Sequence, residues 1–230
     1  MRYLSYFKVF EKTKETEKNK IDELVEKFKK DYGTKLEGEL TIPRIMFLFE
    51  TFKLFDKSFI RNKIPKIIYK DIGNTHGTWH QTSSKKEMTL NPKIFHLKKD
   101  FENGDNDLPY ELFILVHEIG HCIDHVEKIS FSKEWQAISG WKRCGRHERI
   151  PDGYDRYIER RPGKGKPGRK KSEWVYKEDA DFIRAYTAKN PREDFADSFA
   201  FGVFGHWHRF KGEGGKKKME IIKRLLKKID

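Results

Sequence analysis

One strongly apolar stretch, residues 108–129, limits most what this chain can fold into. Its sequence is LPYELFILVHEIGHCIDHVEKI. Apolar side chains recur in it at the spacing of one helical face, at Leu112, Leu115, Val116, Ile119 and Val126. Asp107 and Pro109 suit the start of such a helix. A helix this apolar must be largely buried, so the rest of the chain has to supply a core around it.

The composition allows that core and argues against a membrane protein. Leu, Ile, Val and Phe make up about a quarter of the 230 residues, above the level of roughly one fifth that is typical of disordered chains. No run of about 18 uncharged apolar residues occurs, and Lys8 interrupts a first apolar patch too short for a signal peptide. We therefore expect one cytoplasmic domain with an appendage and no membrane partner. The two cysteines, Cys122 and Cys144, are expected to be reduced thiols.

Within the first 96 residues, the sequence pattern changes from one typical of helices to one typical of strands. Residues 14–31 are highly charged but keep Ile21, Leu24, Val25 and Phe28 on one helical face. A second helix is predicted from Pro43 onward. Between 64 and 96, the runs IPKIIYKDI, GTWHQT and EMTLN predict strands, with SSKK as a hairpin turn. A small antiparallel or mixed sheet fits this pattern.

The second half of the chain contains a basic segment and two further predicted helices. Residues 160–171, RRPGKGKPGRKK, carry seven Lys or Arg with three Gly and two Pro, which predicts a mobile surface loop. A helix is predicted to begin at Asn190 and Pro191, with Asn as its cap. The end of the chain, GEGGKKKMEIIKRLLKK, predicts a glycine joint followed by a short basic amphipathic helix.

The apolar stretch contains His117, Glu118 and His121 in the pattern HEIGH. Histidines four apart lie on the same helical face, about 5.4 Å apart along the axis, so their two imidazoles can share one metal ion. Glu118 follows the first histidine and can take the proton of a water that the metal activates. Two histidines and a glutamate in an apolar helix are costly unless they are paired or bind a metal. The pattern therefore predicts a zinc site.

A catalytic zinc site needs a third protein ligand. His125 lies about 12 Å along the helix from His117, too far for one ion, and Asp124 is a candidate for orienting the site. Glu193 and Asp197 stand four apart on the helix predicted after Pro191, so they face the same way. Glu193 can bind the metal while Asp197 orients a ligand histidine. The alternative for this pair is a solvated helix edge.

The combination of HEIGH with Glu193 and Asp197 resembles the gluzincin metallopeptidases, in which a second helix supplies a glutamate ligand and a further acid. The string YTAKNPREDFADSF, residues 186–199, resembles more closely the anthrax lethal-factor-like and related bacterial metallopeptidases. In that group a tyrosine seven residues before the ligand glutamate helps to stabilise the transition state, and Tyr186 holds that position. The likeness covers about 40 residues. The chain departs from the group by Asp at 197, where Glu is frequent, and by the long gap between His121 and Glu193.

Two further features bear on the chemistry. The phenol of Tyr186 is a neutral donor that can hydrogen-bond a developing oxyanion, although a lone tyrosine is more often core or surface. The predicted hairpin, residues 76–91, offers an exposed strand to which an extended peptide can add, with a sheet that serves only the core as the alternative. His206 and His208 point in different directions on a helix and are left out of the site.

These observations predict an α+β, zincin-like metallopeptidase domain with a small antiparallel or mixed sheet, an active-site helix and a glutamate helix. The predicted boundaries are a helical N-terminal region at 1–62, the catalytic domain at 63–211 and a basic C-terminal helix at 212–230. Zn²⁺ is expected to be held by His117, His121 and Glu193. Glu118 deprotonates the water and passes the proton to the leaving amine, and Tyr186 holds the oxyanion.

The expected substrate is a peptide or protein. The net charge of +13 favours acidic partners, so the basic loop and tail can dock nucleic acid or acidic proteins. Two alternatives follow from this charge. One is a protease that acts on nucleic-acid-bound proteins, and the other is a non-catalytic binding module on the same fold.

Overall fold

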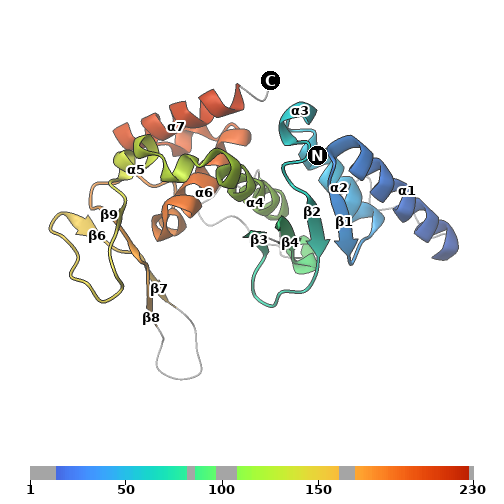
Figure 1. The fold of residues 1–230 in the computed structure, drawn as a ribbon, viewed down its shortest axis with the longest axis horizontal. Coiled ribbons are helices and arrows are strands. Elements are labelled where there is room, and N and C mark those ends of the chain that lie inside the picture. Colours follow the sequence, from blue (N-terminus) through green and yellow to red (C-terminus); the bar gives the residue numbers. More distant parts are fainter. Residues whose placement is uncertain (1–13, 82–85, 97–107, 161–168, 228–230) are drawn as a thin grey trace. The chain divides into compact units, whose positions relative to one another are not determined.

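The computed structural model describes residues 14–81, 86–96, 108–160 and 169–227. The protein is α+β, with small sheets and about seven α-helices in the described part of the chain. It divides into two compact units, one containing the described residues up to Glu118 and the other those from Ile119 onward. Figure 1 labels most of the helices and strands of both units.

The first unit combines helices with a four-stranded sheet. Its elements are α1 (Lys14–Tyr32), β1 (Lys35–Gly38), α2 (Ile42–Phe52), α3 (Lys57–Ile60), β2 (Lys66–Tyr69), β3 (Gly77–Gln81), β4 (Lys86–Leu90), the 3₁₀ helix η2 (Pro92–His96) and the first part of α4 (Tyr110–Glu127). Helix α2 has Pro43 in its first turn. Helix α1 packs against α2 and β1, and its interface with α2 is aromatic. The ring of Phe28 lies about 5 Å from the rings of Tyr32, Phe49 and Phe52.

The sheet has the strand order β1-β2-β4-β3. Strands β3 and β4 form the predicted antiparallel hairpin, in register from Gly77 opposite Leu90 to Gln81 opposite Lys86. Its predicted SSKK turn lies mostly in residues 82–85, outside the described residues. Strands β1 and β2 are parallel, as are β2 and β4. The sheet is therefore mixed, because only the pairing of β3 with β4 is antiparallel. The short strand β1, which was not predicted from the sequence, forms one edge of the sheet and β3 forms the other.

Helix α4 forms from the apolar stretch of residues 108–129. Leu115, Val116 and Ile119 of the predicted apolar face are fully inaccessible, as is Phe113, and Leu112 is half-buried. One assignment to that face was wrong, since Val126 is 52% exposed near the end of the helix. No disulfide joins Cys122 and Cys144, both of which are described and buried.

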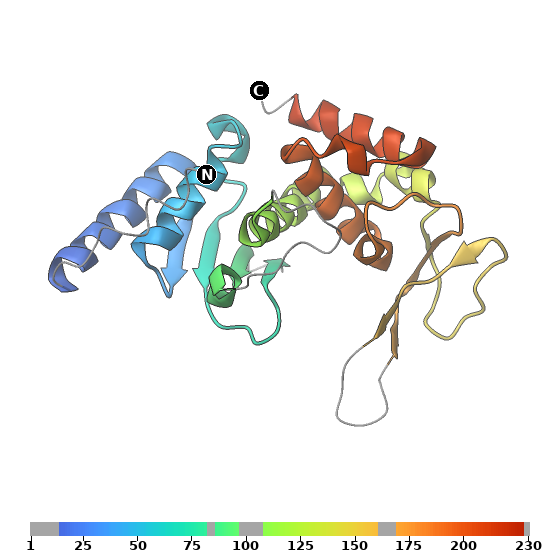
Figure 2. The same ribbon diagram turned by 180° about the vertical axis from the view of Figure 1, so that it is seen from behind.

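The second unit packs helices together and carries small antiparallel sheets. Its elements after α4 are η3 (Ile129–Phe131), α5 (Lys133–Ser139), β5 (Lys142–Arg143), β6 (Tyr154–Asp155), β7 (Ile158–Arg160), β8 (Arg169–Lys171), β9 (Trp174–Lys177), η4 (Ala185–Lys189), α6 (Pro191–Val203), η5 (Trp207–Arg209) and α7 (Gly212–Leu226). Strands β5 and β6 both pair with β9. Helix α7 packs on α5 and α6, as both ribbon views show (Figures 1 and 2).

Two expectations for this unit were wrong in part. Segment 160–171 is not loop throughout, because β7 and β8 pair as an antiparallel hairpin with Arg160 opposite Arg169 (Figure 2). Backbone pairing needs no packed side chains, which is why a basic composition did not prevent it. Residues 161–168 lie outside the described residues. The predicted glycine joint is instead the first turn of α7, whose apolar side is buried through Ile221, Ile222 and Leu225.

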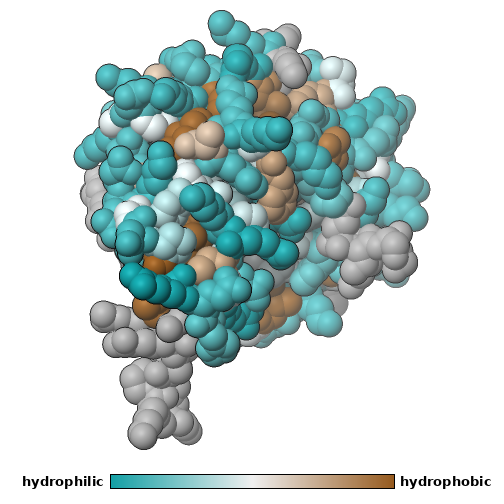
Figure 3. All heavy atoms as spheres, turned by 60° about the vertical axis from the view of Figure 1, so that its left-hand side comes forward, coloured by the Kyte–Doolittle hydropathy of each residue, from teal (hydrophilic) through white to brown (hydrophobic). Residues whose placement is uncertain are grey.

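Hydrophilic residues cover most of the face drawn in Figure 3, and hydrophobic residues appear there as small separate spots. Among the described residues, no helix combines the length and the apolar character needed to cross a bilayer.

Candidate metal centre

Helix α4 carries the first two predicted metal ligands. His117 and His121 lie one turn apart on it, and Glu118 follows His117. The residues His117 and Glu118 are only 6% and 5% exposed. The ring of Phe113, one turn earlier, lies 6.0 Å from the imidazole of His117. The side chains of His117 and Glu118 thus lie on a buried face of the helix, as expected, and not on its exposed surface.

Helix α6 carries the third predicted ligand near its first turn. It begins at Pro191, and the side chain of Asn190 accepts hydrogen bonds from the backbone N–H groups of Arg192 and Glu193 at 2.9 and 3.1 Å. This is the predicted cap. The cap fixes the first turn and therefore the direction in which Glu193 leaves the helix.

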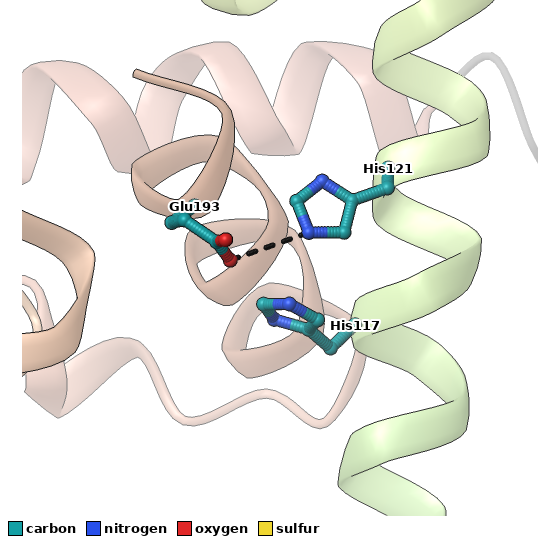
Figure 4. Close-up of side chains that lie close together, drawn as sticks. All are labelled: His117, His121 and Glu193. Carbon is teal, nitrogen blue, oxygen red and sulfur yellow. Dashed lines mark ion pairs between the residues drawn. The ribbon is translucent and has the colours of Figure 1, made fainter. Parts of the chain in front are cut away.

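The three predicted ligands come together. One ligand atom each of His117, His121 and Glu193 lies within 4.8 Å of the others. Figure 4 shows both imidazoles projecting from α4 toward the carboxylate of Glu193. The dashed line in that view joins Nε2 of His121 to Oε2 of Glu193, which are 3.3 Å apart. Among the described residues, no other group of three His, Cys, Asp or Glu side chains comes together in this way.

The donor set fits zinc. Two imidazole nitrogens and one carboxylate oxygen are a common set of three protein ligands in catalytic zinc sites, where the fourth position stays open. Ligands about 2.1 Å from one tetrahedral ion are about 3.4 Å from each other. The separation of 3.3 Å between His121 and Glu193 already has this value.

A glycine allows α4 and α6 to approach closely at the ligand pair. A Cβ added at Gly120, next to His121, would lie 3.1 Å from Cα of Ala196 and 3.3 Å from the ring of Phe199. These contacts are tighter than most that real side chains make. The bare backbone at Gly120 therefore lets the ligand-bearing turn of α4 lie directly against α6.

Glu118 lies against the edge strand of the first unit. A Cβ added at Gly77, the first residue of β3, would lie 2.8 Å from Cγ of Glu118 and 2.9 Å from its Oε1. The Glu118 side chain thus fills the space that a residue other than glycine would need. Gly77 was not predicted from the sequence, because a glycine at the start of a strand carries no signal of its own.

Asp197 is fully buried, so the alternative of a solvated helix edge does not hold for it. Its carboxylate accepts two hydrogen bonds from the guanidinium of Arg184, at 2.6 and 2.9 Å. Arg184 was missed from the sequence, since no spacing rule relates positions 13 apart in different elements. The predicted contact of Asp197 with a ligand histidine stays a prediction.

Tyr186 lies in η4, just before α6. Its ring is flanked by two cations, with the guanidinium of Arg184 5.1 Å and Nζ of Lys189 4.9 Å from its centroid. Nζ of Lys189 donates a hydrogen bond to the Tyr186 hydroxyl at 3.1 Å and lies 3.5 Å from Oε1 of Glu193. Tyr186 is therefore linked to the predicted ligand through a lysine that was not predicted from the sequence.

Asp194 follows Glu193 but serves the packing of α6. It is fully buried, as is Lys218 on α7, whose Nζ donates to its carboxylate at 2.9 Å and to the carbonyl of Asp181 at 2.8 Å. Trp141 Nε1 donates to the same carboxylate at 3.2 Å. Burial raises the pKa of Asp194, and these two donors oppose that shift. The pair joins α6 to α7 and so supports the helix that carries Glu193.

Several other polar residues lie outside the cluster. His125 is half-buried and does not belong to it, as predicted. Asp124 accepts hydrogen bonds from the backbone N–H and the hydroxyl of Ser130 at 2.7 and 2.6 Å, so it anchors the turn after α4 and not the metal site. His206 and His208 lie near each other around η5, with ring centroids 5.6 Å apart.

Comparison with known proteins gives one structural likeness. No family model matches the sequence. No curated protein matches it either. Among solved structures, the chain is similar to a protein from Bacteroides caccae described as "a putative zinc-binding metallo-peptidase". The TM-score is 0.50 at 15% sequence identity, over 94% of this chain and 86% of that one. At this identity the likeness shows a shared α+β fold, of the kind found in metallopeptidases, and no more.

Proposed function

We propose that this protein is a zinc-dependent metallopeptidase of the gluzincin type. The observation that carries the proposal is the convergence of His117, His121 and Glu193 from two helices, with Glu118 buried beside the first ligand. Spacing predicted the two histidines, and spacing together with the family resemblance predicted Glu193. A chance arrangement would not be expected to bring all three ligand atoms within 4.8 Å. The description of the Bacteroides caccae protein agrees with this proposal.

Each residue has a defined task in peptide hydrolysis. His117, His121 and Glu193 would hold Zn²⁺, which when bound lowers the pKa of a water and polarises the scissile carbonyl. Glu118 takes the proton from the attacking water and delivers it to the leaving amine. The Tyr186 hydroxyl donates a hydrogen bond to the oxygen that becomes negatively charged. The peptide bond is broken without a covalent intermediate on the protein.

The finer assignment within the gluzincins is to the anthrax lethal-factor-like and related bacterial metallopeptidases. It rests on the string from Tyr186 to Phe199, and Tyr186 is connected to Glu193 through Lys189. Burial of Asp197 beside Arg184 supports a role for that acid within the site.

The test is cleavage of a diverse peptide mixture by the zinc-loaded wild type, with Glu118→Gln and Tyr186→Phe beside it. Neither residue is a ligand, so both variants should keep about one zinc per chain. Glu118→Gln should nearly abolish turnover, and Tyr186→Phe should lower it by about 10² to 10³, as loss of an oxyanion donor does. Full peptidase activity in a zinc-loaded Glu118→Gln protein would rule out the mechanism.

A second candidate follows from charge. The seven Lys or Arg of residues 160–171 favour a protease that works on nucleic-acid-bound proteins, or a binding module without turnover. Salt-dependent DNA binding together with Glu118-dependent cleavage would identify the first of these. DNA binding by a zinc-loaded protein that cleaves no peptide would identify the second.

A further inference from the structure

Lys189 lies beside the metal cluster and was not among the predicted site residues. It is the last residue of η4, four residues before Glu193, and its side chain is 31% exposed. Its backbone is fixed as well, because the hydroxyl of Ser172 donates to its carbonyl oxygen at 2.7 Å. Most exposed lysines are solvated surface residues. Lys189 differs because its backbone is anchored and its ammonium group lies beside a predicted metal ligand, which indicates a role in the site.

The ammonium contacts two groups with different tasks. It donates to the hydroxyl of Tyr186 at 3.1 Å and lies 3.5 Å from Oε1 of Glu193. The other oxygen of the same carboxylate, Oε2, faces Nε2 of His121 at 3.3 Å. The two oxygens of Glu193 are thus divided, with one toward His121 and the other toward the lysine.

We infer that Lys189 is a positioning residue that ties the Tyr186 hydroxyl to the carboxylate of Glu193, an inference that rests on the proposed function. By holding Oε1, it sets the carboxylate so that Oε2 remains directed at the metal position. By holding the phenol oxygen, it keeps Tyr186 beside the site before substrate arrives. Hydrogen bonds to a ligand carboxylate tune metal sites in this way, and preorganised donors cost no rearrangement during the reaction.

The test uses Lys189→Met, which keeps the length of the aliphatic stem and removes the charge and the donors. Zinc affinity, measured by competition with a chromophoric chelator, should fall about 10-fold. This loss should vanish in the Glu193→Gln background. The matched control is Lys142→Met, since Nζ of Lys142 also lies over a tyrosine ring, that of Tyr154 at 4.3 Å, but outside the cluster. The control should bind zinc like the wild type.

In the peptidase assay at saturating zinc, Lys189→Met should lower kcat about 10-fold with KM nearly unchanged. Lys189→Arg, which restores a cationic donor, should recover part of the loss. In the Tyr186→Phe background, Lys189→Met should have little further effect, because coupled residues give non-additive losses. A residue that only supports folding would show neither the rescue nor the coupling.

Wild-type zinc affinity in Lys189→Met would overturn the inference, as would losses that simply multiply with those of Glu193→Gln and Tyr186→Phe. The zinc titration needs no turnover. If the wild type cleaves no peptide, the proposed function fails, and the titration still decides whether Lys189 positions Glu193.

Discussion

Glu118 packs closely against a glycine, and the acids of α6 form ion pairs with neighbouring cations. Glu118 fits by shape, because its side chain fills the space beside Gly77 that a Cβ would occupy. Glu193 and Asp197 are held by charge, through Lys189 and Arg184 respectively. A steric arrangement depends on the volume of its neighbour and little on salt or on charge. A charged arrangement tolerates small changes of volume but depends on its donors.

This difference agrees with the proposed tasks. A general base must meet the attacking water in a defined position, which close packing against Gly77 favours. A ligand carboxylate must stay ionised and in one orientation, which cationic donors favour. Variants that remove volume, charge or ligand atoms should therefore act differently on the two regions.

The largest effect should come from removing a ligand. His117→Ala, His121→Ala and Glu193→Ala should each weaken zinc binding by more than the 10- to 100-fold that is typical of changes to outer-shell partners, because one of three protein ligands is removed. Metal analysis after dialysis measures this directly. His125→Ala is the matched control, since His125 lies on the same helix outside the cluster. A Glu193→Ala protein with full zinc loading and unchanged affinity would show that the third ligand lies elsewhere.

Next in size, Asp197→Ala should lower zinc affinity or activity by about 10- to 100-fold, as loss of an outer-shell acid does. Asp197→Asn, which keeps the shape and removes the charge, should behave similarly if charge matters here. Arg184→Met should reproduce part of the loss, because it takes away both hydrogen bonds to the carboxylate. Zinc competition and kcat of the three variants give the comparison. If Asp197→Ala keeps the zinc affinity and kcat of the wild type, Asp197 serves only the packing of α6.

A smaller effect on kcat is expected from changing the steric contact between Gly77 and Glu118. Gly77→Ala should lower kcat about 10-fold, because the new Cβ displaces Glu118 by a fraction of an ångström and misplacement of 1 Å can cost about 10². Zinc content should stay at the wild-type level. Thr75→Ala is the control, since it alters an exposed side chain two residues earlier.

The cause can be checked in the Glu118→Asp background, where the shorter side chain leaves room for the new methyl group. There Gly77→Ala should cost little beyond the effect of Glu118→Asp itself. An equal loss in both backgrounds would mean that Gly77 acts on the sheet and not on Glu118.

The same contrast explains what could be predicted from the sequence. Positions within one helix follow a fixed period, so His117 and His121 were found from spacing, as was the capped start of α6 at Asn190. To predict that α4 and α6 converge, the family resemblance was needed as well. The reason is that 71 residues separate His121 from Glu193, and no local rule relates positions so far apart.

Two of the supporting residues could not be predicted because they come from irregular segments. Arg184 precedes η4, and Gly77 begins an edge strand, so neither belongs to a periodic pattern that points at the site. Lys189 did offer a signal, since an ion pair with Glu193 four residues later is a common helical spacing. Strand β1 was missed for a similar reason, because four residues with one buried side chain, Leu36, give no alternation to detect.

The smallest effect on catalysis should come from the basic segment, residues 160–171. Its flanking strands β7 and β8 pair with each other, and Ser172, which follows β8, donates to the carbonyl of Lys189. The base of the hairpin therefore lies beside η4, and none of its described residues belongs to the metal cluster. Neutralising its seven Lys and Arg should leave zinc content and cleavage of a small uncharged peptide nearly unchanged.

Duplex DNA binding by the same neutralised protein should weaken, because fewer cations are available to neutralise phosphates. The slope of log affinity against log salt should flatten by about 0.9 for each phosphate that the hairpin no longer neutralises. The measurement is duplex binding at two salt concentrations for the wild type and the hairpin variant, with a variant neutralised on α7 at Lys216, Lys217 and Lys223 as the comparison for charge alone. Identical curves for the wild type and the hairpin variant would mean that the hairpin charges do not bind DNA. An equal loss per neutralised charge in the hairpin and α7 variants would assign the binding to net charge and not to the hairpin.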